Sequence, residues 1–345
     1  MKSLVIPIGP GRAFLLLLAA AALLGVPACG GSGGGSSDQP GVPGGGGSLP
    51  EPSAFQFIDQ NMPEAAFLVA DNIDVFAGGL GELNAVVIEL LEDGVVDFDL
   101  SGLCDGSGTA VFNATPPLGP GGSALLTLTN CIDGAIGGTV SYGIASYDPA
   151  AVLRTDGGPS PWFIGLSVRV RLEGVGDTGP QRTDARFLVA AFRDANTLVF
   201  RYFGDDSYWT LVENDERTTM ACFDFAVAFR DNAVVFGDRA ITDGYGRSKG
   251  SIVNARNRIF TFWNSGTEPE LVFERSGDAL HLVGGGGLTL RPEGVCPVIG
   301  APDGITPGTG HLQILPDPAV FDGVILRLHT GAEIRTTWNE IIDDD

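Results

Sequence analysis

The stretch RFLVAAFRDANTLVFRYF, residues 186–203, decides the fold. Two apolar-rich segments flank a short polar turn, Arg193 to Asn196. A turn this short can join only antiparallel neighbours. The stretch FAVAFRDNAVVFG, residues 225–237, repeats the arrangement, with the same Ala-Phe-Arg-Asp motif before its turn. The sequence therefore predicts a series of β-hairpins.

The same pattern of strand, polar turn and strand recurs in residues 251–263, 271–283 and 324–338. Upstream, apolar residues alternate with arginine in 168–172 and with aspartate in 96–100, which indicates strands with one buried face. A meander this long has to curl or fold into layers to bury its apolar side. We therefore predict a mainly β fold, an antiparallel meander curled into a barrel or folded into a two-layer sandwich.

A short N-terminal helix precedes the strands. Apolar residues from Ala66 to Ala77 recur at three- and four-residue spacing, Asn61 and Pro63 suit a helix start, and Gly78 with Gly79 suits its end. The next apolar run, 83–91, fits either a helix or a strand.

Charge is distributed unevenly along the chain. The 345 residues hold 42 Asp and Glu against 20 Lys and Arg, a net charge of −22 that argues against nucleic acid as a partner. No basic residue occurs between Cys29 and Arg154. We therefore predict an acidic helix-plus-strand section in residues 50–150 and an antiparallel β section in residues 151–345. One continuous sheet with uneven charge is the alternative.

The first 28 residues read as an export signal, because Lys2 and Arg12 precede an apolar run too short to span a bilayer. Val-Pro-Ala-Cys at 26–29 resembles the bacterial lipobox, which implies that Cys29 is lipidated. Residues 29–49 are rich in Gly, Ser and Pro and read as a flexible tether. The residue after Cys29 is Gly30 and not the aspartate associated with inner-membrane retention, so the same resemblance implies an outer-membrane location. Which face of the outer membrane the protein occupies stays open. An ordinary secretory signal with an incidental cysteine is the alternative.

Three further stretches, residues 61–72, 103–144 and 308–338, resemble the opening helix, cysteine-framed strands and closing strands of β-rich outer-membrane lipoproteins of Gram-negative bacteria. That group has no assigned activity. The resemblance implies a β-rich, lipid-anchored envelope protein and implies nothing about chemistry.

Four cysteines remain after Cys29, and an even number in an exported chain predicts disulfides. Three pairings are possible. We favour Cys104 with Cys131 and Cys222 with Cys296, because each bridge then closes a loop inside one section of the chain.

Motifs for catalysis and cofactors are sparse. The stretch GVGDTG, residues 174–179, matches a dinucleotide-binding pattern, but Pro180 and a strand follow it, so we expect a hairpin and no cofactor. The three histidines, His281, His311 and His329, lie far apart in the sequence and match no catalytic motif. A pair of carboxylates could serve glycoside hydrolysis, but with 42 acidic residues the sequence does not single out such a pair. Aspartates in expected loops make calcium candidates of Asp205, Asp206, Asp238 and Asp243.

These observations favour a non-catalytic, lipid-anchored envelope protein that serves as a structural or interaction module. Its partners would be the membrane, through the anchor, and a protein of unspecified kind. The main alternative is a carrier that holds a lipid or another hydrophobic ligand inside a β-barrel or curved sheet. A periplasmic hydrolase ranks third.

Overall fold

The computed structural model describes residues 52–104, 107–115, 119–132, 135–150, 163–176, 179–193, 197–230, 233–237, 248–264, 270–276, 279–292, 296 and 310–342. The predicted signal peptide, Cys29 and the predicted tether lie outside these residues, as do Asp238 and Asp243.

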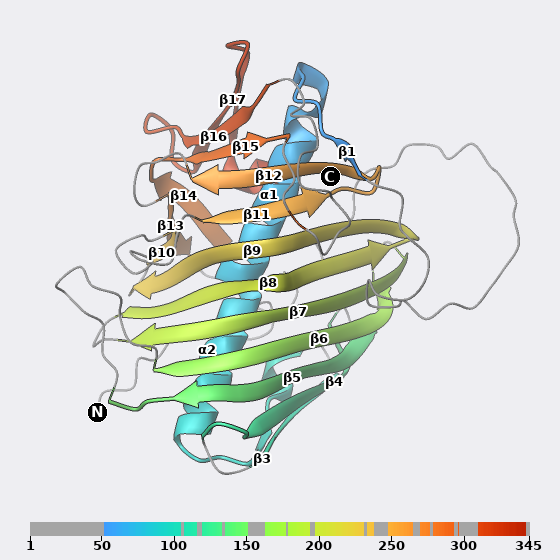
Figure 1. Ribbon diagram of the computed structural model, residues 1–345, viewed down its shortest axis with the longest axis vertical. Coiled ribbons are helices and arrows are strands. Elements are labelled where there is room, and N and C mark those ends of the chain that lie inside the picture. Colours follow the sequence, from blue (N-terminus) through green and yellow to red (C-terminus); the bar gives the residue numbers. More distant parts are fainter. Residues whose placement is uncertain are drawn as a thin grey trace, which may run out of the picture.

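The described chain is mainly β, as predicted, with helices near its beginning and one at its end (Figure 1). The helices are α1 (Met62–Ala77), α2 (Gly79–Glu92) and α4 (Trp338–Ile342), with short 3-10 turns at Asp59–Asn61 and Ser101–Leu103. The strands up to the middle of the chain are β1 (Ser53–Ala54), β2 (Asp97–Asp99), β3 (Thr109–Thr115), β4 (Ser123–Ile132), β5 (Ile136–Tyr147), β6 (Ile164–Gly176), β7 (Gly179–Arg193), β8 (Thr197–Glu213) and β9 (Glu216–Arg230). The later strands are β10 (Ala233–Phe236), β11 (Lys249–Val253), β12 (Arg258–Asn264), β13 (Leu271–Ser276), β14 (Ala279–Gly284), β15 (Leu288–Arg291), β16 (Leu312–Pro316), β17 (Gly323–Leu328) and β18 (Glu333–Thr337).

The predicted hairpins all form. Strands β7 and β8 pair in antiparallel register, and so do β9 with β10, β11 with β12, β13 with β14, and β17 with β18. The GVGDTG stretch joins β6 to β7 as a hairpin connection, because Val175 pairs with Pro180. From β2 to β9 each strand pairs with the next one in the chain.

After β9 the meander splits, which the sequence did not predict. Residues 227–230 of β9 pair with β10, whereas residues 219–224 of the same strand pair with β11. Strand β10 leads to β13 and β14, and β11 leads through β12 to β15, β16, β17 and β18. A long strand can carry two short partners end to end on one edge, so two branches grow from β9.

The sheet is not closed into a barrel over the described residues. The registered pairings leave β2, β14 and β18 each with a neighbour on one edge alone. The barrel alternative is therefore wrong, and the sheet bends around its helices instead (Figure 1). The sheet also continues across the boundary predicted between residues 50–150 and 151–345, because β5 pairs with β6 along most of its length.

Helices α1 and α2 lie one after the other across one face of this sheet (Figure 1). The first has the predicted bounds, and the ambiguous run 83–91 is helical, so its strand reading is wrong. Gly78 separates the two helices, and its N–H bonds to the carbonyl of Asp74 at 2.7 Å. Since both helices are mostly apolar and buried, they form the centre of the core and do not merely cover it.

Aromatic side chains fill the space between the helices and the sheet. Phe76 of α1 is fully buried, and its ring centroid lies within 4.8–5.7 Å of five aromatic rings on β7, β8 and β9. Phe200, Phe229 and Phe236 belong to the same cluster. Phe192 lies in a smaller, separate cluster with Val199 and Val235. The helix-facing side of the sheet is thus packed with the protein's own side chains.

A buried polar network ties α2 to this aromatic cluster. The Asn84 amide donates to the Tyr202 hydroxyl at 3.3 Å, and that hydroxyl donates to the carbonyl of Phe76 at 3.3 Å. Tyr142 donates to the Asn84 side-chain oxygen at 3.4 Å. Buried polar groups cost little when they bond to one another, so a polar residue is tolerated at the centre of the core.

Gly81 of α2 marks the closest approach of helix and sheet. A methyl group at this position would overlap the Phe229 ring and would stand 2.9 Å from the Phe76 carbonyl oxygen. We expect Gly81→Ala to lower the free energy of unfolding by about 1–3 kcal/mol in urea denaturation, although alanine favours helices. Gly102→Ala, where no atom lies within 4 Å of the added carbon, is the control with little expected effect. Equal stability of the two variants would contradict this packing.

Both predicted disulfides are confirmed. Cys104 pairs with Cys131, and Cys222 pairs with Cys296. The first joins the turn after β2 to the end of β4, and the second fastens residue 296 to β9.

Candidate functional site

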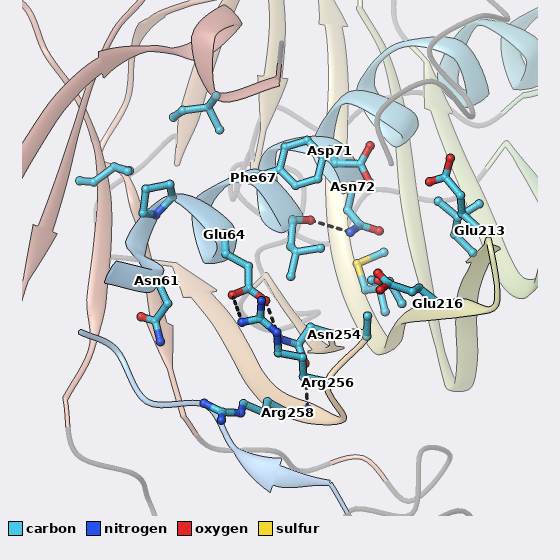
Figure 2. Close-up of a pocket in the computed structure, with 18 of the residues that line it drawn as sticks. Asn61, Glu64, Phe67, Asp71, Asn72, Glu213, Glu216, Asn254, Arg256 and Arg258 are labelled. Carbon is cyan, nitrogen blue, oxygen red and sulfur yellow. Dashed lines mark hydrogen bonds and ion pairs between the residues drawn. The ribbon is translucent and has the colours of Figure 1, made fainter. Parts of the chain in front are cut away.

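A pocket of about 1070 Å³ opens beside the first turns of α1. Its walls come from elements far apart in the sequence: α1, the β8–β9 hairpin, the β11–β12 turn, β17, β18 and α4. Its volume is large enough for a small organic ligand. Figure 2 shows the polar side chains that line it.

The floor of the pocket is apolar. Trp209 of β8 and Met220 of β9 stand opposite one another in the ladder, and both are buried. Leu68 and Phe67 of α1 and Leu211 of β8 extend this surface. The floor can therefore contact the hydrocarbon or aromatic part of a ligand.

The β8–β9 turn places two carboxylates at one side of the pocket. Asn214 and Asp215 both have positive φ, 48° and 68°, as a two-residue hairpin turn with matching twist requires. This turn sets Glu213 directly opposite Glu216. Like charges opposite one another in a sheet repel, so this side of the pocket has a locally unfavourable concentration of negative charge.

Asp71 of α1 adds a third carboxylate to that side (Figure 2). Burial, and then the charges of Asp74 and Glu213, raise the pKa of Asp71 from 3.8 to about 7. Burial likewise raises the pKa of Glu213, although a 3.0 Å hydrogen bond from the Gln181 amide opposes the shift. Burial thus disfavours the charged form of both carboxyl groups.

On the other side of the pocket, the negative charge of Glu64 is compensated by an arginine. Glu64 of α1 accepts a hydrogen bond of 2.7 Å from the Asn254 amide and forms an ion pair of 3.3 Å with Arg256. Arg258 lines the same region (Figure 2). The pocket is therefore uneven in charge, with arginines beside Glu64 and the carboxyl groups of Asp71, Glu213 and Glu216 on the other side.

The calcium candidates are not brought together within the described chain. Asp205 and Asp206 lie within β8, at a register shift between Phe203 and Tyr208, and not in the expected loop. Asp206 forms an ion pair of 3.2 Å with Arg186. In the described part of the chain, no group of three or more His, Cys, Asp and Glu side chains is placed to hold a metal ion.

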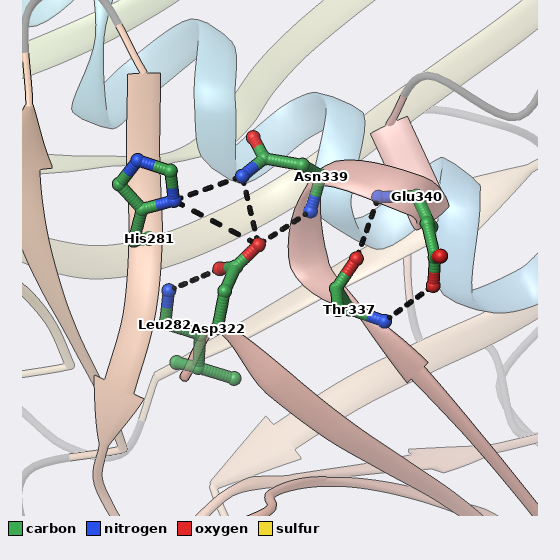
Figure 3. Close-up of polar contacts among 6 residues, drawn as sticks. All are labelled: His281, Leu282, Asp322, Thr337, Asn339 and Glu340. Carbon is green, nitrogen blue, oxygen red and sulfur yellow. Dashed lines mark hydrogen bonds and ion pairs between the residues drawn. The ribbon is translucent and has the colours of Figure 1, made fainter. Parts of the chain in front are cut away.

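The histidines lie outside the pocket. Figure 3 shows His281 in a network with Asp322 and Asn339, where the Asn339 amide lies 2.9 Å from Nδ1 of His281 and donates to Asp322 at 2.7 Å. Asp322 also accepts the backbone N–H groups of Asn339 and Leu282 at 3.0 and 2.7 Å. This network caps α4 and fastens it to β14, which is a structural role. His311 and His329 form a separate pair with ring centroids 6.0 Å apart.

Sequence reasoning missed the carboxylates of the pocket. The one local signal for them was Glu-Asn-Asp-Glu at 213–216, in which a turn-forming pair stands between two acids. Asp71 gave no signal, because it is one of several polar residues within the expected helix.

No family model, curated protein or solved structure matches the chain. Among the described residues, no helix combines the length and the apolar character that crossing a bilayer requires. The fold and site together define a helix-filled, open β-sheet protein with a polarised pocket.

Proposed function

We propose that the protein is a lipid-anchored lipoprotein of the outer membrane whose folded body is a non-catalytic binding module. The observation that carries the binding role is the pocket beside α1, with an apolar floor and the carboxyl groups of Asp71, Glu213 and Glu216 on one side. The lipobox-like residues ending at Cys29 and the Gly- and Ser-rich stretch after it support the anchoring.

The carrier alternative is less well supported. A carrier needs an empty apolar interior, whereas helices α1 and α2 and rings such as Phe76 and Phe200 occupy the helix-facing side of the sheet. In this proposal the curled sheet is a single layer wrapped around its own helices. Its ligand then binds beside α1 and not within the core.

A hydrolase is also less well supported. Paired catalytic carboxylates work when their environments move their pKa values apart, so that one is a proton donor and the other stays ionised. In this pocket burial raises the pKa of both Asp71 and Glu213, and no histidine of the described chain lines it to serve as a further acid or base.

Labelling tests the anchor directly. A radioactive fatty acid should label the chain in a Gram-negative host and should not label the Cys29→Ala variant. The wild-type chain should fractionate with the outer membrane. Equal labelling of the variant, or an unlabelled wild-type chain in the soluble periplasmic fraction, would contradict the proposal.

A further inference from the structure

The sheet has an open edge at β2. Among the described strands this one pairs with β3 alone, in a register that sets Phe98 opposite Phe112. The edge of β14 is different, because Asp322 accepts the N–H of Leu282 at 2.7 Å. An open edge presents a row of backbone N–H and C=O groups, and another extended chain can pair with that row.

The pairing of β2 with β3 determines which backbone groups face outward. The Leu100 N–H and the Val96 carbonyl both bond to β3, at 2.7 and 2.9 Å. Residues along an antiparallel strand bond alternately to one side and to the other. Since Val96, Phe98 and Leu100 bond to β3, the backbone groups of Asp97 and Asp99 point toward the open edge. No second strand of the described chain pairs with them.

One face of β2 leaves apolar surface in contact with water. Val96 and Phe98 are each 46% exposed, whereas Phe112, opposite Phe98 on β3, is 0% exposed. Phe112 belongs to the main core cluster, so this is the helix-facing side of the sheet. The core therefore ends at β3, and Val96 and Phe98 form its rim. A strand added at this edge would cover the rim with apolar side chains of its own.

The other face of β2 carries negative charge. Asp97 and Asp99 alternate with the apolar residues, so their side chains lie on the outer face, and both are exposed. Strands β2 to β5 contain no lysine, arginine or histidine. A second copy of this chain, with its net charge of −22, would be repelled from this edge. Charge complementarity favours a strand with basic side chains on its outer face.

We propose that β2 is a docking edge for an extended segment of another protein in which apolar and basic residues alternate. The segment adds to the sheet as a further strand, and its backbone bonds to the outward groups of Asp97 and Asp99. Its apolar side chains cover Val96 and Phe98, and its basic side chains lie beside the two aspartates. A shift of one residue would exchange the two faces, so the alternation itself is recognised. No residue of β2 lines the pocket beside α1, so this surface is additional to the pocket.

Three labelled peptides of equal length test this proposal. The first alternates lysine with valine and phenylalanine. The second carries glutamate in place of lysine, and the third has the composition of the first in an order without alternation. Fluorescence anisotropy with the full chain measures their affinities. We expect the alternating lysine peptide to bind about tenfold more tightly than either of the others, because it alone satisfies both faces of the edge.

Hydrogen exchange of the wild-type chain locates the bound peptide. The outward amides of Asp97 and Asp99 should exchange about tenfold more slowly when the alternating lysine peptide is bound, because they then bond to its backbone. The amides of the β8–β9 turn, beside the pocket, should exchange at an unchanged rate.

A charge reversal on each of two strands tests the role of the aspartates. Asp97→Lys should weaken binding of the alternating lysine peptide by about tenfold. Glu274→Lys makes the same change of charge at an exposed position of β13, which has a neighbour on both edges. It is the matched control and should leave the affinity unchanged.

Three results would overturn the proposal: equal binding of the alternating and reordered lysine peptides, no binding of the alternating peptide, or unchanged exchange of the Asp97 and Asp99 amides at saturation. Self-association of the wild-type chain that protects the same amides would also overturn it, because a second copy would then occupy the edge. The exchange measurement uses the wild-type chain, so it decides the matter even if Asp97→Lys does not fold.

Discussion

Replacing Phe76 with alanine is expected to lower the free energy of unfolding by about 3–5 kcal/mol. Its ring is 0% exposed and meets the rings of Phe187, Tyr202, Trp209 and Phe225, among others, so its removal leaves a cavity between α1 and three strands. The rigid aromatic neighbours are poorly able to close such a cavity. Urea denaturation followed by circular dichroism, with both disulfides intact, measures this loss.

Phe98→Ala is the matched control. The Phe98 side chain is 46% exposed, because its strand β2 is short and has one neighbour, β3. Its loss should cost less than about 1 kcal/mol. If Phe76→Ala and Phe98→Ala lowered stability equally, the helix would not be the centre of the core.

Replacing Asp71 with asparagine is expected to stabilise the protein at pH 8 by about 1–4 kcal/mol. The pKa of Asp71 is raised from 3.8 to about 7, so the folded state favours the protonated carboxyl group. This contribution to stability is fully present below pH 3.8 and is lost as the pH rises through about 7. Each pH unit of such a shift corresponds to about 1.4 kcal/mol, which sets the upper limit. Asparagine removes the charge and with it the cost.

Denaturation midpoints measured from pH 4 to pH 8 test this expectation. The wild-type chain should lose stability relative to Asp71→Asn as the pH rises, and the two should converge near pH 4. Asp97→Asn should follow the wild-type curve throughout. Parallel curves for the wild-type chain and Asp71→Asn would show that Asp71 titrates normally.

A residue that lowers stability at neutral pH is informative about function. Groups with strongly perturbed pKa values cluster at functional sites, where stability is exchanged for binding or catalysis.

Local patterns predicted the hairpins, the first helix and the disulfides. The β7–β8 and β9–β10 turns follow from short polar breaks between apolar segments, which depend on neighbouring residues alone. Helix α1 has start and end signals at Asn61, Pro63 and Gly78. These features need no knowledge of the rest of the chain.

Features that depend on distant contacts were not predictable in the same way. The split of β9 between β10 and β11 depends on two short strands meeting one long edge, and nothing local fixes that choice. The expected buried face of residues 96–100 was wrong for Val96 and Phe98, because alternation cannot distinguish an edge strand from a central one. Helix and strand were both possible for residues 83–91 until their contact with the sheet was known.

The pocket illustrates the same limit. Its residues run from Ile58 to Ile341 and come together only when α1, the β8–β9 hairpin and α4 meet. The raised pKa of Asp71 arises from burial, then from Asp74 on the same helix and from Glu213, which is 142 positions away in the chain. Burial and the contact with Glu213 depend on the folded chain, so the sequence around Asp71 could not single it out among the many acids.

The sheet wraps around its own helices, whose side chains fill the space between them and the strands, so no lipid is carried in the core. Native mass spectrometry of the full chain, extracted from membranes in mild detergent, tests it when compared with the mass after denaturation. We expect the native and denatured masses to agree, with the covalent anchor retained in both. A membrane lipid bound in the native state and lost on denaturation would contradict it.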